Sequence, residues 1–201
     1  MVDTQDEMVG EDFSDAVLAR ADWRGRSLHG CDFTDADLAG MRTHNVTFTD
    51  CDFTGADLSG SRHTATAFRN CTFERTVLAS AVIDGCTLIG SRFRQARLRP
   101  STIRETDLTL VALPAADLRG LDLSGLRMRE VDLFEADLRR ADLREADLTG
   151  ARLTEANLEE ADLRGARIDA KSFRQVKLWG ARADLALAMA FSAAHGLVID
   201  D

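Results

Sequence analysis

Large apolar residues recur at every fifth position from Phe13 to Leu178, and this spacing dominates the sequence. The 34 positions hold nineteen Leu, eight Phe, three Ile, one Trp and one Met, and only Thr43 and His63 depart from a large apolar residue. Two residues before each of these central positions the side chain is usually small and is Ala in 14 repeats, and the residue between them is Asp in 14 repeats. Such regular self-similarity indicates a repeat architecture.

A period of five fits neither a helix nor a strand taken alone. Five residues advance an α-helix by about 500°, and an odd step places successive strand residues on opposite faces. The central residues share one interior only if each pentad forms one side of a closed coil. Phe centres pair with Phe centres five times at a spacing of four pentads, and only twice at each of the spacings of one, three and five pentads. Because Cys31, Cys51 and Cys71 also recur four pentads apart, the sequence predicts four pentads per coil.

The A(D/N)Lxx register over residues 13–182 resembles that of the pentapeptide repeat proteins. This resemblance implies an all-β solenoid, a right-handed quadrilateral β-helix with a short C-terminal α-helix as its cap. We expect residues 11–182 to form the β-helix and residues 1–10 to be a disordered acidic tail. We assign residues 183–201 to a C-terminal helix and strand that serve as cap and dimerisation element.

The C-terminal segment has the features of a capping helix, which a solenoid needs because its last coil exposes an apolar cross-section. Residues 184–195 are rich in Ala, Leu and Met, with Asp184 as a candidate N-cap and Gly196 as a candidate C′ residue. Two alternatives stay open: the helix only caps the last coil, or it also forms a dimer, which the family resemblance favours. The residues assigned to the dimer interface are Leu185, Leu187, Met189, Phe191, Leu197 and Val198.

Candidate chemistry is sparse. All four cysteines, Cys86 included, occupy the small inward position, where burial as small apolar side chains accounts for them. The sequence contains no CxxC pair, which would indicate a metal site. Thr43 and His63 are expected to be stacked neighbours that form a polar substitution in the core. No phosphate-binding, dinucleotide-binding, metalloprotease or nucleophile-elbow motif is present. The sequence therefore predicts no enzyme activity, no metal and no cofactor.

Charge limits the classes of partner. The chain has 34 acidic and 25 basic residues, a net charge of −9, which disfavours direct binding of nucleic acid. No apolar run approaches the roughly 18 residues that span a membrane, and the acidic start lacks the apolar segment of a secretory signal, so we expect a cytoplasmic protein without membrane contact. The face around Phe13 is the most acidic. Its carboxylates are Glu11, Asp12, Asp15, Asp32, Asp35 and Asp52.

Four stretches, residues 63–78, 97–113, 117–130 and 190–197, are similar to the mycobacterial fluoroquinolone-resistance members of the pentapeptide repeat family. The resemblance implies a homodimer that mimics B-form DNA, occupies the DNA-binding saddle of DNA gyrase, inhibits supercoiling and protects the enzyme from fluoroquinolones. It implies an acidic gyrase-binding surface made of Asp117, Asp122, Asp132, Glu135, Asp137, Asp142 and Asp147. Because the five-residue register shows no insertion, recognition is expected to come from the faces of the solenoid. The alternative is a structural or scaffolding repeat protein that binds another partner along one face.

Overall fold

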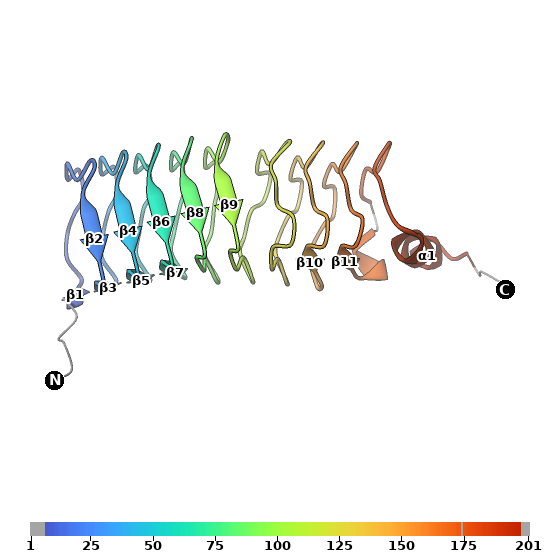
Figure 1. Ribbon diagram of the computed structural model, residues 1–201, viewed down its shortest axis with the longest axis horizontal. Coiled ribbons are helices and arrows are strands. Elements are labelled where there is room, and N and C mark those ends of the chain that lie inside the picture. The colour runs from blue at the N-terminus through green and yellow to red at the C-terminus, as the bar shows by residue number, and fades with distance from the viewer. Residues whose placement is uncertain (1–6, 174, 198–201) are drawn as a thin grey trace. The chain divides into compact units, whose positions relative to one another are not determined.

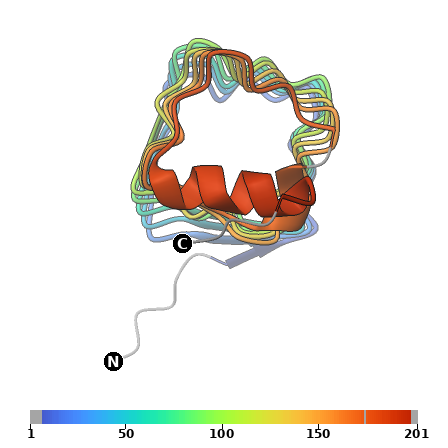
Figure 2. The same ribbon diagram turned by 90° about the vertical axis from the view of Figure 1, so that its right-hand side faces the viewer.

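The computed structural model describes residues 7–173 and 175–197, and it divides into two compact units, unit 1 (Met1–Asp107) and unit 2 (Leu108–Asp201). Each unit is a stack of four-sided coils, one pentad to a side, whose quadrilateral outline is visible in Figure 2. The predicted fold class, a quadrilateral β-helix of pentapeptide repeats with a short C-terminal α-helix, is therefore confirmed.

Unit 1 contains two parallel sheets that run along the stack on different sides of the coil (Figure 1). Each strand pairs with the strand one coil later, so that Trp23 is opposite Thr43 and Thr43 is opposite His63. The first sheet holds β1 (Glu7–Val9), β3 (Ser27–His29), β5 (Thr47–Thr49) and β7 (Ala67–Arg69). The second holds β2 (Asp22–Arg24), β4 (Arg42–His44), β6 (Arg62–Thr64), β8 (Val82–Asp84) and β9 (Thr102–Arg104).

Most coils of unit 2 are joined by isolated parallel bridges instead of strands, with the same offset of one coil. The strands β10 (Asp147–Leu148) and β11 (Arg167–Ile168) of this unit pair with each other. A 3₁₀-helix, η1 (Ala170–Phe173), follows β11, and the α-helix α1 (Leu185–Ala194) follows the last coil. Figure 2 shows α1 at that end of the stack, along one side of the quadrilateral outline.

Many pentads turn the corner through a tight turn formed by their last two residues, whereas the pentads that contain a strand end in a bend. The N–H of Ala36 donates to the carbonyl oxygen of Phe33 at 3.1 Å, and Asp35 between them has φ of +55°. A positive φ at this position is typical of type II turns and favours Gly, Asn and Asp. Between the corners, ladder hydrogen bonds such as Phe33 N–H to Asp52 C=O, at 2.7 Å, join one coil to the next.

The interior is filled by the central residues, as the spacing predicts. Phe13, Phe33, Phe53, Phe73 and Phe93 form one column, with neighbouring ring centroids 4.5–5.0 Å apart and nearly parallel. In unit 2 most of the same positions hold Leu, and nearly all of them are buried. The residues two positions before each centre are mostly small and are largely buried as well, although Met41, Leu121 and Leu126 show that a larger side chain fits at some of these positions.

Two local features differ from the predicted boundaries. Residues 7–10 belong to the β-helix instead of a tail, because Met8 lies one five-residue step before Phe13 and pairs with Leu28. The regular coil is also interrupted at η1, although Phe173 within it keeps its central position and is buried. No helix in the described part of the chain is long and apolar enough to span a bilayer.

Candidate interaction surface

The aspartates that precede the central residues have a structural role in the turn. In each of Asp122, Asp132, Asp137 and Asp142, one carboxylate oxygen accepts the N–H two residues later, at 3.0–3.2 Å. This local bond is the one that favours Asp and Asn in turns. Asn157 makes the same bond with its amide oxygen, at 3.0 Å, so the fold requires the oxygen and not the charge.

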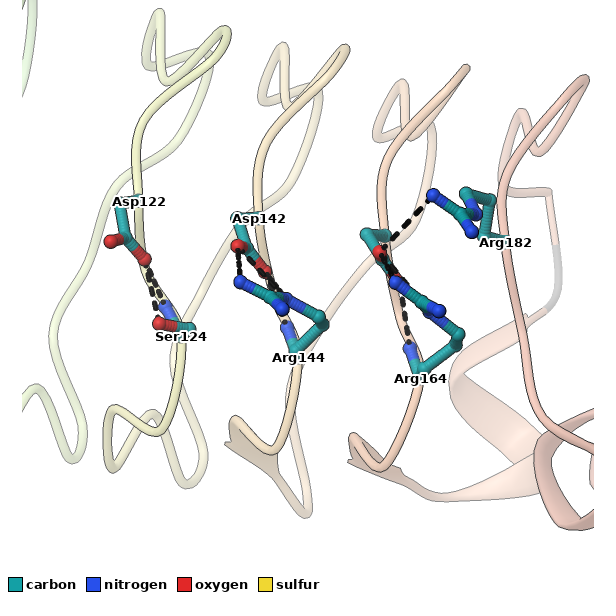
Figure 3. Close-up of polar contacts among 7 residues, drawn as sticks. Asp122, Ser124, Asp142, Arg144, Arg164 and Arg182 are labelled. Carbon is teal, nitrogen blue, oxygen red and sulfur yellow. Dashed lines mark hydrogen bonds and ion pairs between the residues drawn. The ribbon is translucent and has the colours of Figure 1, made fainter.

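Many of these aspartates are paired with an arginine two residues later. Arg144 donates from Nε and Nη2 to Asp142, at 2.8 and 2.5 Å, and Arg164 binds Asp162 in the same way. Asp117 and Asp137 have equivalent partners in Arg119 and Arg139. The repeated sequence Asp-Leu-Arg thus makes a bidentate ion pair between residues two positions apart on one side of the coil, as Figure 3 shows for Asp142 and Arg144.

These pairs keep the carboxylates ionised. The hydrogen bond from Arg144 holds the pKa of Asp142 below its usual range, and the hydrogen bond from Arg164 lowers the pKa of Asp162 to about 2. Arg182, one coil further along, also approaches Asp162, at 3.8 Å. The carboxylates of Asp142 and Asp162 therefore stay ionised at neutral pH, but each has a guanidinium group within a few ångströms that offsets most of its charge.

Asp147 differs from the other predicted site residues because it is buried. Its carboxylate accepts from the hydroxyl of Thr149 and lies 2.9 Å from Arg167 and 4.0 Å from Arg129. Burial opposes ionisation, but the bonds from Thr149 and the two arginines outweigh it and hold the pKa of Asp147 below its usual value. This side chain therefore stabilises the coil and offers little surface to a partner.

A smaller set of acidic side chains in unit 2 has no ion pair among the described residues. The carboxylate of Asp122 accepts from Ser124, which donates both its N–H and its hydroxyl (Figure 3). Glu135 is exposed at a corner position, with φ of +57°. Three further exposed glutamates, absent from the predicted site, lie at equivalent corners, and their sequence signal is an acidic residue at the second position after a centre. They are Glu130, Glu145 and Glu155.

Two of these corner glutamates lie above a glycine of the next coil. A Cβ on Gly150 would be 2.9 Å from Cγ of Glu130, and a Cβ on Gly165 would be 3.2 Å from Cγ of Glu145. Because the glycines leave this space open, the acidic side chain folds over the neighbouring corner. The arrangement positions an uncompensated carboxylate at the edge of the coil.

Unit 1 contains a second acidic column, on the face predicted to be the most acidic. Asp12, Asp32 and Asp52 follow each other in register, one coil apart. Each accepts the N–H two residues later, and none forms an ion pair within the described residues. In this column the aspartates lack the arginine partners found in unit 2, so its charge is less compensated.

The helix α1 presents a largely apolar surface. Leu185 is 77% exposed, Met189 and Phe191 are partly exposed, and Leu197, which follows the helix, is 64% exposed. Leu187 is buried at 5% and lines, with Phe173, Leu178 and Phe191, an apolar hollow of about 340 Å³ under the helix. Within one chain, Leu187 therefore packs against the last coil as part of the cap. Val198, the last residue of the predicted dimer interface, lies outside the described residues.

The predicted stack of Thr43 and His63 is confirmed and lies in the interior of unit 1. The Thr43 hydroxyl is 2.8 Å from Nδ1 of His63, and Nε2 of His63 is 2.9 Å from the Ser61 hydroxyl. All three residues are buried, so no substrate reaches the imidazole. The four cysteines are free and buried, and no cluster of His, Cys, Asp and Glu in the described part of the chain could hold a metal ion.

Comparison with known families supports the repeat assignment. The family model of pentapeptide repeats matches residues 12–42 and 132–169, in eight copies, and the model of the pentapeptide repeat region matches residues 42–123. Together these matches cover well over half of the chain. Among curated proteins, no sequence matches.

Solved structures show the same fold. A trypsin-treated variant of QnrB1, a plasmid-mediated fluoroquinolone resistance protein, is 22% identical, with a TM-score of 0.74, and 98% of each chain is covered. HetL, a pentapeptide repeat protein involved in heterocyst differentiation regulation from the cyanobacterium Nostoc sp. strain PCC 7120, is 21% identical, with a TM-score of 0.58. That match covers 90% of this chain and 87% of HetL.

Proposed function

The chain belongs to the pentapeptide repeat family, and on that premise we propose that it is a dimeric DNA mimic that binds DNA gyrase. It occupies the DNA-binding saddle, inhibits supercoiling and thereby protects the enzyme from fluoroquinolones. We place it in the cytoplasm and assign it no catalysis and no cofactor. The fold it shares with QnrB1, described as a fluoroquinolone resistance protein, is consistent with this role.

The observation that carries the proposal is the charge of residues 121–160. These two coils contain eleven acidic residues and six arginines, a net charge of −5. Two coils rise by about 9.6 Å, and B-form DNA carries about six charges over that length. The charge density along the axis therefore approaches that of DNA, although the Asp–Arg pairs reduce the local field. The acidic residues of this segment without an ion pair among the described residues are Asp122, Glu159 and the corner glutamates Glu130, Glu135, Glu145 and Glu155.

The corner glutamates give the sharpest test. Replacing Glu135, Glu145 and Glu155 by Gln removes three charges while keeping a residue that this corner accepts, since Gln95 and Gln175 have the same positive φ. We expect the concentration that inhibits gyrase supercoiling by half to rise at least about fivefold, because association with a basic groove depends on the complementary field. A gel assay of supercoiling with purified gyrase measures this.

Two matched variants control for net charge. Asp15→Asn, Asp35→Asn and Asp50→Asn remove three corner carboxylates from unit 1, where Asn45 shows that Asn fits the corner; this variant should lose less inhibition. Arg139→Gln with Arg144→Gln removes two paired arginines and should strengthen inhibition. If micromolar wild-type protein leaves supercoiling and quinolone-induced cleavage unchanged, the gyrase proposal is wrong.

A second candidate function is that of a scaffold that binds another protein along one face of the solenoid. The pairing of Asp117, Asp137, Asp142 and Asp162 with arginines favours it, because such a surface is nearly neutral at short range. HetL, of similar fold, is described as acting in the regulation of differentiation. Capture from a bacterial lysate separates the two: the DNA mimic retains gyrase subunits, whereas the scaffold retains a different protein.

A further inference from the structure

The last repeats of unit 1 reverse the charge pattern of the chain. Residues 91–107 carry five arginines against one Glu and one Asp, a net charge of +3. Arginines occupy the positions on both sides of Phe93, where Asp precedes the central residue in 14 repeats. In the same column the in-register residues change from Asp52 to Thr72 and then to Arg92.

Three arginines of this segment lack the partners that arginines have in unit 2. Arg92, Arg94 and Arg97 are exposed, as is Arg75 in the coil before. None of the four forms an ion pair with a carboxylate among the described residues, whereas Arg139 and its equivalents in unit 2 bind an aspartate. An Arg side chain stays protonated at any physiological pH, so these guanidinium groups repel one another unless an anion lies between them.

A surface hollow lies between two of these arginines. Its volume is about 240 Å³, and its lining is Thr72, Glu74, Arg92 and Arg94. The backbone fixes the two coils against each other here, since Phe73 N–H donates to Arg92 C=O and Arg75 N–H donates to Arg94 C=O, both at 2.8 Å. The residues that line the hollow thus carry two guanidinium groups and a hydroxyl that can donate hydrogen bonds, together with one carboxylate.

We propose that this hollow binds inorganic phosphate. Arg92 and Arg94 are suited to chelate the phosphate oxygens, because the planar guanidinium group matches oxyanions in a bidentate geometry. Glu74 selects among anions. Its ionised carboxylate only accepts hydrogen bonds, so it favours an anion that keeps a P–OH group at neutral pH and disfavours sulfate, which has no such hydroxyl.

The same geometry argues against a nucleic acid strand as the ligand. A phosphodiester has no P–OH to donate to Glu74. A strand that continued along this face would also meet Asp52 and Asp32, which lie one and two coils before Thr72 in the same column. Those carboxylates repel phosphate. The ligand is therefore compact, and the proposal does not depend on gyrase binding.

Titration calorimetry of the full chain at pH 7 tests the proposal, with inorganic phosphate and sulfate at equal ionic strength. We expect one site per chain and a preference for phosphate over sulfate of at least about tenfold. Because sulfate carries the larger mean charge at this pH, simple charge attraction predicts the opposite order. Glu74→Gln should abolish the preference, and Arg92→Gln with Arg94→Gln should weaken phosphate binding at least about tenfold.

A second arginine pair provides the matched control. Arg42 and Arg62 are exposed and lie in register on β4 and β6, and neither lines the hollow. Arg42→Gln with Arg62→Gln should leave phosphate binding unchanged. Equal binding of phosphate and sulfate by the wild type overturns the proposal without any variant. A similar loss in both arginine variants, or tighter binding of a short single-stranded oligonucleotide than of phosphate, also overturns it.

Discussion

At the scale of single residues, the buried imidazole of His63 makes stability depend on pH. It is fully enclosed, with Thr43 and Ser61 at its two ring nitrogens and the ring of Phe68 edge-on at 5.2 Å. Burial lowers the pKa of His63 to about 4. The neutral ring is satisfied by hydroxyl groups, whereas a protonated ring would be a charge without a counterion.

This burial predicts that unit 1 loses stability in mild acid. Below its ordinary pKa of about 6.5 the unfolded chain binds a proton at His63, but the folded chain does not until about pH 4. The loss therefore develops between these values and amounts to about 2 kcal/mol at pH 5. Urea unfolding at pH 7 and pH 5 measures it, with His63→Gln as the comparison because an amide bonds to hydroxyl groups without titrating.

The variant should be less sensitive to this pH change than the wild type, while the carboxylates affect both proteins alike. An equal fall in the unfolding midpoint of both proteins would show that His63 is already protonated in the folded state, or that it does not titrate in the unfolded one. Either result contradicts the assignment of the buried ring as neutral.

At the scale of elements, aspartates accept the last hydrogen bonds between coils where the chain leaves the regular coil. In a regular coil the corner N–H donates to a backbone carbonyl near the corner of the next coil, as Gly125 does to Arg144. Where a helix begins instead, the acceptor is no longer the backbone carbonyl of the residue 19 positions later but the carboxylate of that residue. Gly150 N–H donates to the Asp169 carboxylate before η1, at 2.9 Å, and Gly165 N–H donates to the Asp184 carboxylate before α1, at 2.7 Å.

Asp184 joins two functions in this way, because its other oxygen accepts the N–H of Leu187 and caps α1. The hydrogen bonds from Leu187 and Gly165 lower its pKa. Asp184→Ala should therefore lower the temperature at which the helical circular dichroism signal is lost and speed hydrogen exchange of Gly165. Asp184→Asn keeps one accepting oxygen for the Leu187 N–H but sets a donating NH₂ group against the Gly165 N–H, so it should retain only part of the cap.

The pH dependence of this cap has a definite sign. Because the pKa of Asp184 is lower in the folded protein, its contribution is complete above the ordinary aspartate value of 3.8 and is lost as the pH falls through the lowered value. The difference between wild type and Asp184→Ala should consequently shrink as the solution is acidified below that ordinary value. A difference that persists unchanged in acid would contradict an ionic cap.

The sequence predicts elements well where one period controls them and poorly where two roles compete for one residue. Central residues such as Phe33 and the cysteine column are specified by spacing alone, because an odd step leaves only a closed coil. The family resemblance assigns the aspartates before several centres to a recognition surface, but in Asp137 and Asp142 a carboxylate oxygen also bonds within the turn and the charge is paired with Arg139 or Arg144. Pairing depends on side-chain geometry, which a five-residue period does not contain.

At the scale of the whole molecule, the net charge of −9 is not evenly spread along the chain. Residues 121–160 carry −5, while residues 91–107 carry +3. A uniform DNA mimic would not include a basic segment. This uneven distribution fits the two proposals made above, a basic partner for the acidic coils and a separate anion for the basic segment.

The proposed dimer is a property of the whole molecule that α1 can test. Leu185 and Met189 lie one helical turn apart and are exposed, whereas the ring of Phe191 contacts Phe173 and belongs partly to the cap. We therefore expect Leu185→Glu with Met189→Glu to convert a dimer into a monomer by light scattering at micromolar concentration, with unchanged circular dichroism. Two charges buried in an apolar dimer interface would strongly destabilise the dimer, whereas the same charges on an exposed helix face hardly change the stability of the monomer.

Val17→Glu is the control for this experiment, because Val17 is 80% exposed in unit 1 and its replacement adds charge away from α1. That variant should keep the mass of the wild type. If the wild type is itself a monomer, α1 is a cap alone, and gyrase inhibition by the monomer would show that a single acidic solenoid suffices. If the Leu185 and Met189 variant stays dimeric, the interface lies on another surface of the chain.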